Sequence, residues 1–164
     1  MHRLDQTNLA LSALALALAC LLWWFGRGPP TPWPQLTGLA PAQVHQLELF
    51  ADERLVWRLL RDPAGWTLTH PELARASSAR VGELLGLLRT PSLDRFPAVG
   101  TLAPYGLDAP RYRLVVEGRE LAFGGLEPTT GHRYVRVDGM VHLIGDGFYH
   151  HLAAAPERWR ASGD

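Results

Sequence analysis

The feature that most constrains this chain is a run of uncharged residues near its N-terminus. Residues 9–25 read LALSALALALACLLWWF and contain no charged side chain. At about 1.5 Å of rise per residue, a helix of this length covers about 25 Å, enough for the hydrocarbon core of a thin bilayer. Leu and Ala favour helix, and a helix satisfies every backbone polar group in lipid. We therefore predict that residues 1–27 form a single transmembrane anchor.

Aromatic rings and arginines mark the ends of this anchor. The rings lie at its C-terminal end, where aromatic side chains favour the headgroup region. The α-amino group and Arg3 precede the run and Arg27 follows it, which favours an N-terminus inside the cell and a domain in the periplasm of the bacterial inner membrane. The residues expected to contact lipid are Leu9, Leu16, Leu22, Trp23, Trp24 and Phe25.

Two alternatives to an uncleaved anchor remain for this segment. The residues Ala17 and Ala19 form the small-x-small pattern of a signal-peptide cleavage site, and Cys20 stands where a lipoprotein would carry its lipid. Cleavage before Cys20 would leave an apolar N-terminus, CLLWWF, on the mature chain. Lipoprotein signals usually have Leu where this chain has Ala17. We therefore favour the uncleaved anchor.

Prolines separate the anchor from the rest of the chain. The sequence GPPTPWP follows Arg27, and proline-rich segments favour a stiff polyproline II spacer. We predict a linker over residues 28–38, one folded domain over 39–155 and a C-terminal tail over 156–164. The 16 basic residues balance the 16 acidic ones, so no net charge attracts nucleic acid. Nucleic-acid binding is not expected.

The first part of the domain has the pattern of a small antiparallel sheet. Residues 44–50 and 55–60 alternate loosely between apolar and polar and predict a hairpin. The sequence DPAG at 62–65 favours a type I turn into a third strand, 66–69, which His70-Pro71 ends. Trp57 and Trp66 are expected in the core.

A helix is predicted from Ser77 or Ser78 to about Arg89. Its apolar residues have the i, i+3, i+4, i+7 spacing of one buried stripe. Gly82 and Gly86 have two possible explanations. They allow the backbone of a neighbouring element to approach closely, or they are small residues tolerated on the outer face of the helix. The stripe consists of Val81, Leu84, Leu85 and Leu88.

The second part of the domain has the pattern of two further hairpins. A loop is expected over 90–101, a helical turn over 102–105 capped by Gly106, and strands over 112–117, 120–123, 133–137 and 140–144. Asp138-Gly139 is the strongest hairpin signal in the chain. A short helix is expected from about Gly147 to Ala155. Consecutive hairpins predict an α+β fold with a mostly antiparallel sheet.

Several motifs of this sequence resemble those of a known family. The segment Tyr105-Gly106-Leu107-Asp108-Ala109-Pro110 is similar to the YGLD-x-P signature of the bacterial domain of unknown function 4340. Also similar are WTL at 66–68 with the following His70-Pro71, the helix leading to Arg95-Phe96, and the Phe123-Gly124 strand end followed by GHRYVR at 131–136. The resemblance spans about residues 39–152.

The resemblance implies an extracytoplasmic domain tethered to the inner membrane. Some longer relatives accompany ABC transporter permeases, including auxiliary components of gliding motility. This chain carries a single short copy and no second membrane helix, which puts a full transporter role in doubt. The family supplies no catalytic residues to carry over. Its motif is interpreted as architecture: a glycine cap at Gly106, a docked Leu107, and a strand led by Pro110.

Outside these motifs, the sequence has few residues in the patterns of catalytic, phosphate-binding or metal-binding sites. None of its serines lies in a G-x-S-x-G elbow, and Gly124-Gly125 lacks the Lys, Ser or Thr of a phosphate loop. His150 and His151 are adjacent, so on a helix they point about 100° apart. We expect no catalytic residues, no metal and no cofactor, with the histidines scattered over the surface. The serines are Ser12, Ser77, Ser78, Ser92 and Ser162.

Two function classes follow from these observations. The first is an accessory or scaffolding subunit of an inner-membrane complex, such as an ABC transporter permease assembly, that contacts the lipid bilayer and a protein partner. The second is a tethered ligand-binding or hydrolytic domain acting alone. Trp159 between two arginines suits a partner groove or anionic headgroups, and equally a tail folded back onto the sheet. The candidate partner contacts are Trp33, Arg158, Trp159 and Arg160.

Overall fold

The structure is a computed structural model that describes residues 14–21 and 33–161. The chain divides into two units, residues 1–32 and 33–164. Residues 14–21 form an exposed helix that contains Leu16, and the other five expected lipid contacts lie outside the described residues. Within the described ranges, no helix combines the length and the apolar character needed to cross a membrane.

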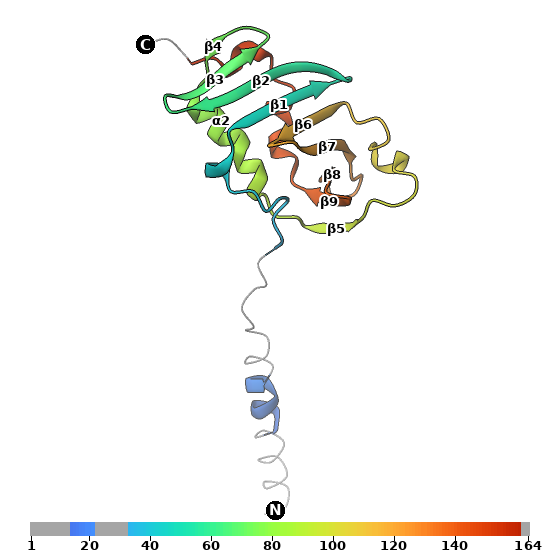
Figure 1. The fold of residues 1–164 in the computed structure, drawn as a ribbon. Coiled ribbons are helices and arrows are strands. Elements are labelled where there is room, and N and C mark those ends of the chain that lie inside the picture. The colour runs from blue at the N-terminus through green and yellow to red at the C-terminus, as the bar shows by residue number, and fades with distance from the viewer. Residues whose placement is uncertain (1–13, 22–32, 162–164) are drawn as a thin grey trace, which may run out of the picture. The chain divides into compact units, whose positions relative to one another are not determined.

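Residues 33–161 fold around one sheet of nine strands whose neighbours are all antiparallel (Figure 1). The strand order is β4-β3-β2-β1-β6-β7-β8-β9-β5. This confirms the mostly antiparallel sheet domain. The strands are β1 Gln46–Ala51, β2 Arg54–Asp62, β3 Gly65–His70, β4 Ala74–Arg75, β5 Asp94–Pro97, β6 Tyr112–Val116, β7 Arg119–Leu126, β8 Arg133–Val137 and β9 Met140–Ile144.

Tight turns build two meanders, and β1 joins them by pairing with β6. The predicted hairpin at Asp138-Gly139 is confirmed: both residues have positive φ, 50° and 74°. Glu117-Gly118 has the same pattern, 50° and 77°, between β6 and β7. Such turns match the right-handed twist of the strands they connect. The pairing of β1 with β6 brings the two predicted blocks into one sheet.

Two edge strands were not expected from the sequence. The segment 90–101, predicted as a loop, contains β5, which crosses to the far edge and pairs with β9. Strand β4 is only two residues long and pairs with β3. Figure 1 shows β4 and β5 at opposite ends of the sheet. Neither segment alternates strongly, and Pro97 ends β5, as is common at a sheet edge.

One face of the sheet, the inner face, is covered by helices. Helix α2, Ser78–Leu85, begins at Ser77, whose side chain accepts a hydrogen bond from Arg80 N. Its predicted apolar stripe is buried, but the helix ends at Leu85 and continues to Arg89 as a 3₁₀ turn. The other helical segments are α3 Tyr149–Leu152 and the 3₁₀ turns η1 Pro41–Gln43, η2 Gly86–Arg89, η3 Ala103–Tyr105, η4 Asp146–Phe148 and η5 Pro156–Trp159.

The folded unit extends beyond the expected limits of 39 and 155. On the N-terminal side, residues 34–37 run along residues 88–92: Leu36 N donates to Thr90 O at 2.9 Å and Ser92 N donates to Pro34 O at 2.7 Å. On the C-terminal side, Ser77 N donates to Trp159 O at 2.8 Å and Ala161 N to Arg75 O at 2.8 Å. Half of the expected linker and most of the expected tail are therefore part of the fold.

Candidate functional site

A serine and a histidine lie side by side in the interior. Ser92 and His142 are 1% and 5% exposed, and His142 Nδ1 lies 2.9 Å from Ser92 Oγ. His142 on β9 lies opposite Val135 on β8 and opposite Arg95 on β5. His142 is therefore not one of the surface histidines that the sequence predicted.

The hydrogen bonds of this pair are those of a structural contact. Ser92 Oγ donates to Asp94 O at 2.9 Å, so its proton is engaged with the backbone and His142 Nδ1–H donates to the hydroxyl. A nucleophilic serine needs the reverse arrangement, with the imidazole accepting its proton. Burial lowers the pKa of His142, with Arg95 lowering it further and Asp138 opposing. The pair fixes β5 to β9.

The YGLDAP segment docks on the other face of the sheet, the outer face, over β7, β8 and β9. Gly106 has φ +66° and ends the turn η3, as predicted. Leu107 folds back with its N donating to Leu102 O at 3.2 Å, and it is 1% exposed. It packs in a second, smaller apolar cluster with Leu102, Ala122 and Val141.

Two glycines of β7 receive this segment. A Cβ on Gly124 would lie 2.2 Å from Tyr105 O, and a Cβ on Gly106 would lie 2.9 Å from Gly125 N. Both distances are shorter than real Cβ contacts, so Gly124 and Gly106 allow backbone to pack on backbone. The glycine pair that follows Phe123 is therefore a docking site for Tyr105 and Leu107.

Polar and aromatic contacts complete the docked segment. Asp108 accepts a hydrogen bond from Leu102 N at 2.9 Å and so closes the loop that holds η3. The ring of Tyr105 lies between those of Phe96 and Tyr134, at centroid distances of 5.1 Å and 4.9 Å. The motif residues thus serve packing and loop closure, in line with the architectural interpretation.

Arg133 is a buried charge that the sequence reasoning did not single out as a functional group. It is 8% exposed, forms an ion pair with Asp146, and donates to Gly124 O at 2.6 Å. Its guanidinium lies 3.5 Å from the ring centre of Tyr149. One side chain thereby fastens the C-terminal helices to β7. The alternation of side chains along β8 could have indicated its burial, because Arg133 faces inward with Val135 and Val137.

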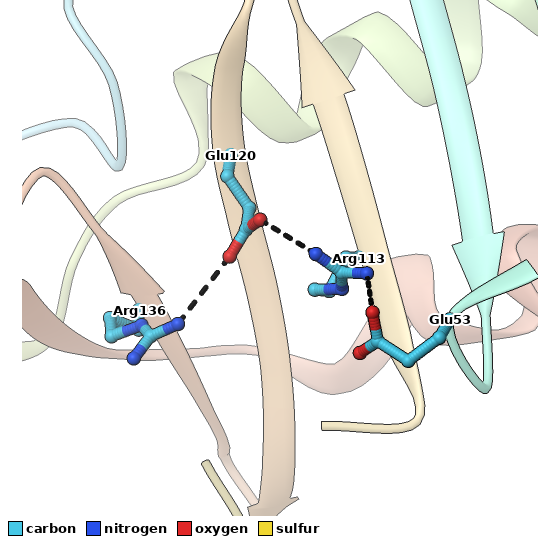
Figure 2. Close-up of polar contacts among 4 residues, drawn as sticks. All are labelled: Glu53, Arg113, Glu120 and Arg136. Atoms are coloured by element: carbon cyan, nitrogen blue, oxygen red, sulfur yellow. Dashed lines mark hydrogen bonds and ion pairs between the residues drawn. The ribbon is translucent and has the colours of Figure 1, made fainter. Parts of the chain in front are cut away.

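The uncovered part of the outer face carries a row of ion pairs, shown in Figure 2. Glu120 on β7 accepts from Arg113 on β6 at 3.0 Å and from Arg136 on β8 at 3.4 Å. Arg113 also pairs with Glu53 in the β1–β2 turn. We call the surface formed by Glu53, Arg113, Glu120 and Arg136 the ion-paired face.

Neighbouring ion pairs continue this pattern. Glu48 on β1 pairs with Arg58 on β2 at 2.6 Å, and Arg119 pairs with Asp138 at 2.9 Å between two hairpin turns. The exposed fractions of the row run from 22% for the Arg113 side chain to 76% for that of Glu53. Charges of opposite sign alternate across the strands, so this surface is polar and nearly neutral.

The four candidate partner contacts do not form one surface. Trp159 is 2% exposed and stacks on Trp57 with ring centres 5.0 Å apart, so it takes the alternative position, folded back onto the sheet. Arg160 pairs with Glu72, and Arg158 lies near Arg80 on α2. Only Trp33, 61% exposed, presents a large apolar surface. Arginines flank Trp159 in sequence, but the residue ends the 3₁₀ turn η5 and its ring is buried.

Histidine and carboxylate side chains do not gather into a metal site: over residues 14–21 and 33–161, no three such groups lie close enough to hold an ion. His150 and His151 nonetheless stack with ring centres 3.9 Å apart, closer than their predicted divergence on a helix.

Fold and site define a small antiparallel-sheet domain with a docked YGLDAP segment and a polar outer face. The family model described as "Domain of unknown function (DUF4340)" matches residues 66–163, more than half of the chain. The chain belongs to this family, as its motifs indicated. No curated protein and no solved structure matches it. The match begins in β3, later than the expected start near residue 39, and ends beyond the expected residue 152.

Proposed function

We propose that this protein is an accessory or scaffolding subunit of an inner-membrane complex, with its sheet domain outside the cytoplasmic membrane. An ABC-type transport assembly is the partner class that we favour. The observation that carries the proposal is the locked start of the domain beside a short tether. Residues 34–37 are hydrogen-bonded to residues 88–92, so the fold begins within ten residues of the end of the apolar run.

The length of the tether limits how far the domain can act. Seven residues separate Phe25, the last residue of the apolar run, from Trp33, the first described residue of the domain. Even a fully extended chain of this length reaches only about 25–30 Å. If residues 9–25 span the bilayer, the domain stays close to the membrane surface. A subunit of a membrane complex needs to reach no farther.

The ion-paired face is the surface that we assign to the partner. It lies beside the docked YGLDAP segment, and within residues 33–161 no helix packs on it, whereas the inner face is covered. Its side chains are already held in place by one another, so binding would cost little additional side-chain entropy. Alternating charges also favour a specific register with a partner over non-specific attraction.

The arrangement of polar groups supports a non-enzymatic role. The proton of Ser92 is bound to a carbonyl, and Arg133 is engaged by Asp146 and Gly124. A catalytic site instead needs a reactive group that is accessible and free to exchange a proton. The alternative, a tethered hydrolytic or ligand-binding domain acting alone, predicts that residues 33–164 keep their activity when detached.

Cross-linking in native membranes tests the proposal. A photoreactive amino acid at Arg136, on the ion-paired face, should give a discrete cross-link to a membrane protein. The same group at Ala79, exposed on α2, is the matched control and should not. The full chain should also stay in the membrane fraction after a carbonate wash.

A charge-reversal variant sharpens this experiment. Glu120→Arg replaces the carboxylate beside Arg113 by a second positive charge, so cross-linking from position 136 should fall several-fold while the domain stays folded. Equal cross-linking from positions 136 and 79 would contradict the assignment of the ion-paired face as the partner surface. Release of the chain by carbonate would contradict the proposal of a membrane subunit. It would favour the alternative, a domain that acts alone.

A further inference from the structure

A small cleft lies between α2 and the C-terminal helical segments. Its volume is about 140 Å³. It is formed by α2 on one side and by α3 and η5 on the other, and a hydrogen bond from Arg80 to the carbonyl of Arg158 joins α2 to η5. The side chains that matter for its chemistry are Arg80, Glu83, His150, His151, Arg158 and Trp159.

The charged groups of this cleft are mainly cationic. Two guanidiniums, those of Arg80 and Arg158, face one carboxylate, that of Glu83. Among residues 33–161, neither arginine is within ion-pair distance of a carboxylate, whereas seven other arginines are. Each guanidinium has five N–H donors, and the single bond from Arg80 leaves most of them available.

His150 and His151 also line this cleft and carry a positive charge when they are protonated. Their rings lie 3.9 Å apart, so protonating both places like charges in contact. Burial lowers the pKa of His151, with His150 and Arg158 lowering it further and Glu83 raising it. A bound anion would oppose these effects, because it favours the protonated imidazoles. Anion binding and proton uptake are therefore coupled at this cleft.

The wall of the cleft includes a buried donor without an acceptor. Trp159 is 2% exposed, and its Nε1 has no hydrogen-bond partner within the described part of the chain. A buried N–H without an acceptor is costly, and such groups are rare in folded proteins. The cleft thus combines an excess of positive charge with an aromatic wall formed by Trp159.

We propose that this cleft binds a phosphate group, either as free phosphate or as the phosphate of an anionic lipid headgroup. Its volume is well below the roughly 300–1,000 Å³ of sites for larger ligands, so one small group fills it. Guanidinium groups match the geometry of phosphate oxygens. The site is separate from the ion-paired face and does not depend on the proposed partner.

The test is a titration of the full chain in neutral detergent micelles. Imidazole resonances of His150 and His151 are followed by NMR, with inorganic phosphate in one arm and phosphatidylglycerol added to the micelles in the other. The apparent pKa of His151 should rise and saturate in at least one arm. The arm with the lower half-saturation identifies the source of the phosphate group.

Variants assign the effect to the cleft. Arg158→Gln should raise the half-saturation concentration about tenfold, as expected for loss of one charge-assisted contact. Glu83→Gln should lower it, and Arg158→Lys should restore much of the binding. Arg54→Gln, at the exposed start of β2, is the matched control and should change nothing.

Three results would overturn the assignment. The first is no change of either histidine in either arm. The second is an equal change when chloride replaces phosphate at the same ionic strength. The third is an Arg158→Gln variant that binds as the wild type does, with an unchanged thermal midpoint showing that it is folded.

Discussion

The inner and outer faces of the sheet are stabilised in different ways. The inner face is apolar and covered: Trp57 and Trp159 stack there beneath the helical segments, 0% and 2% exposed. The outer face is divided between a small apolar cluster under the YGLDAP segment and the ion-paired face. Apolar burial contributes most of the stability of a domain, while exposed ion pairs contribute little. Substitutions on the ion-paired face should therefore have a small cost to folding.

The largest effect is expected from removing an inner-face ring. Trp159→Ala should lower the free energy of unfolding by about 3–5 kcal/mol, because it leaves a cavity against Trp57. Chemical denaturation measures the change. Trp33→Ala, at a ring that is 61% exposed, is the control and should change it by less than about 0.5 kcal/mol. Similar values for the two variants would show that the tail is not part of the core.

The next effect concerns the apolar part of the outer face. Gly124→Ala places a Cβ 2.2 Å from Tyr105 O and 2.8 Å from Leu107 Cγ, which forces the YGLDAP segment away from β7. We expect a loss of about 1–3 kcal/mol in the free energy of unfolding. Gly145→Ala is the control, because its Cβ would meet nothing within 4 Å and its φ is −61°. A neutral Gly124→Ala would mean that the segment docks loosely.

The dependence of stability on pH is expected to come from the inner face. Burial lowers the pKa of His142, and that of His151, below the ordinary value near 6.5. The unfolded chain then binds protons more readily than the folded one. The thermal midpoint should be highest above pH 6.5 and should fall as the pH drops below it. His142→Asn should reduce this slope, and an unchanged slope would show that another group causes it.

The smallest effect is expected on the ion-paired face. Glu120→Gln removes the carboxylate shared by Arg113 and Arg136, and we expect a loss of about 0.2–1 kcal/mol in the free energy of unfolding. The loss should shrink as salt is added, because these side chains are partly exposed. Denaturation at low and high ionic strength measures both values. A loss as large as that of Trp159→Ala would contradict the contrast between the two faces.

Local sequence signals predicted most of the elements. Asp138-Gly139 marked its hairpin, Gly106 its left-handed cap, and the stripe from Val81 to Leu88 the buried side of α2. Each depends on neighbours within a few residues. Strands β4 and β5 were missed because they are short edge strands, held by β3 and β9 rather than by their own pattern.

The candidate sites were harder to predict, because each joins distant residues. The contact between Ser92 and His142 spans 50 positions, and that between Arg113 and Glu53 spans 60. The sequence is equally compatible with Trp159 on the surface and with Trp159 in the core, because its flanking arginines suit both positions. Only the packing against Trp57 decides between them.

The sequence by itself determined the hairpins, the helix cap and the family, because these depend on local backbone preferences and on motif order. The tertiary structure decided how β1 meets β6, which face the YGLDAP segment covers, and where the charged groups converge. Those outcomes follow from pairing and packing between segments far apart in the chain. No local pattern encodes such contacts, and the ion-paired face and the cationic cleft therefore appear only in the folded domain.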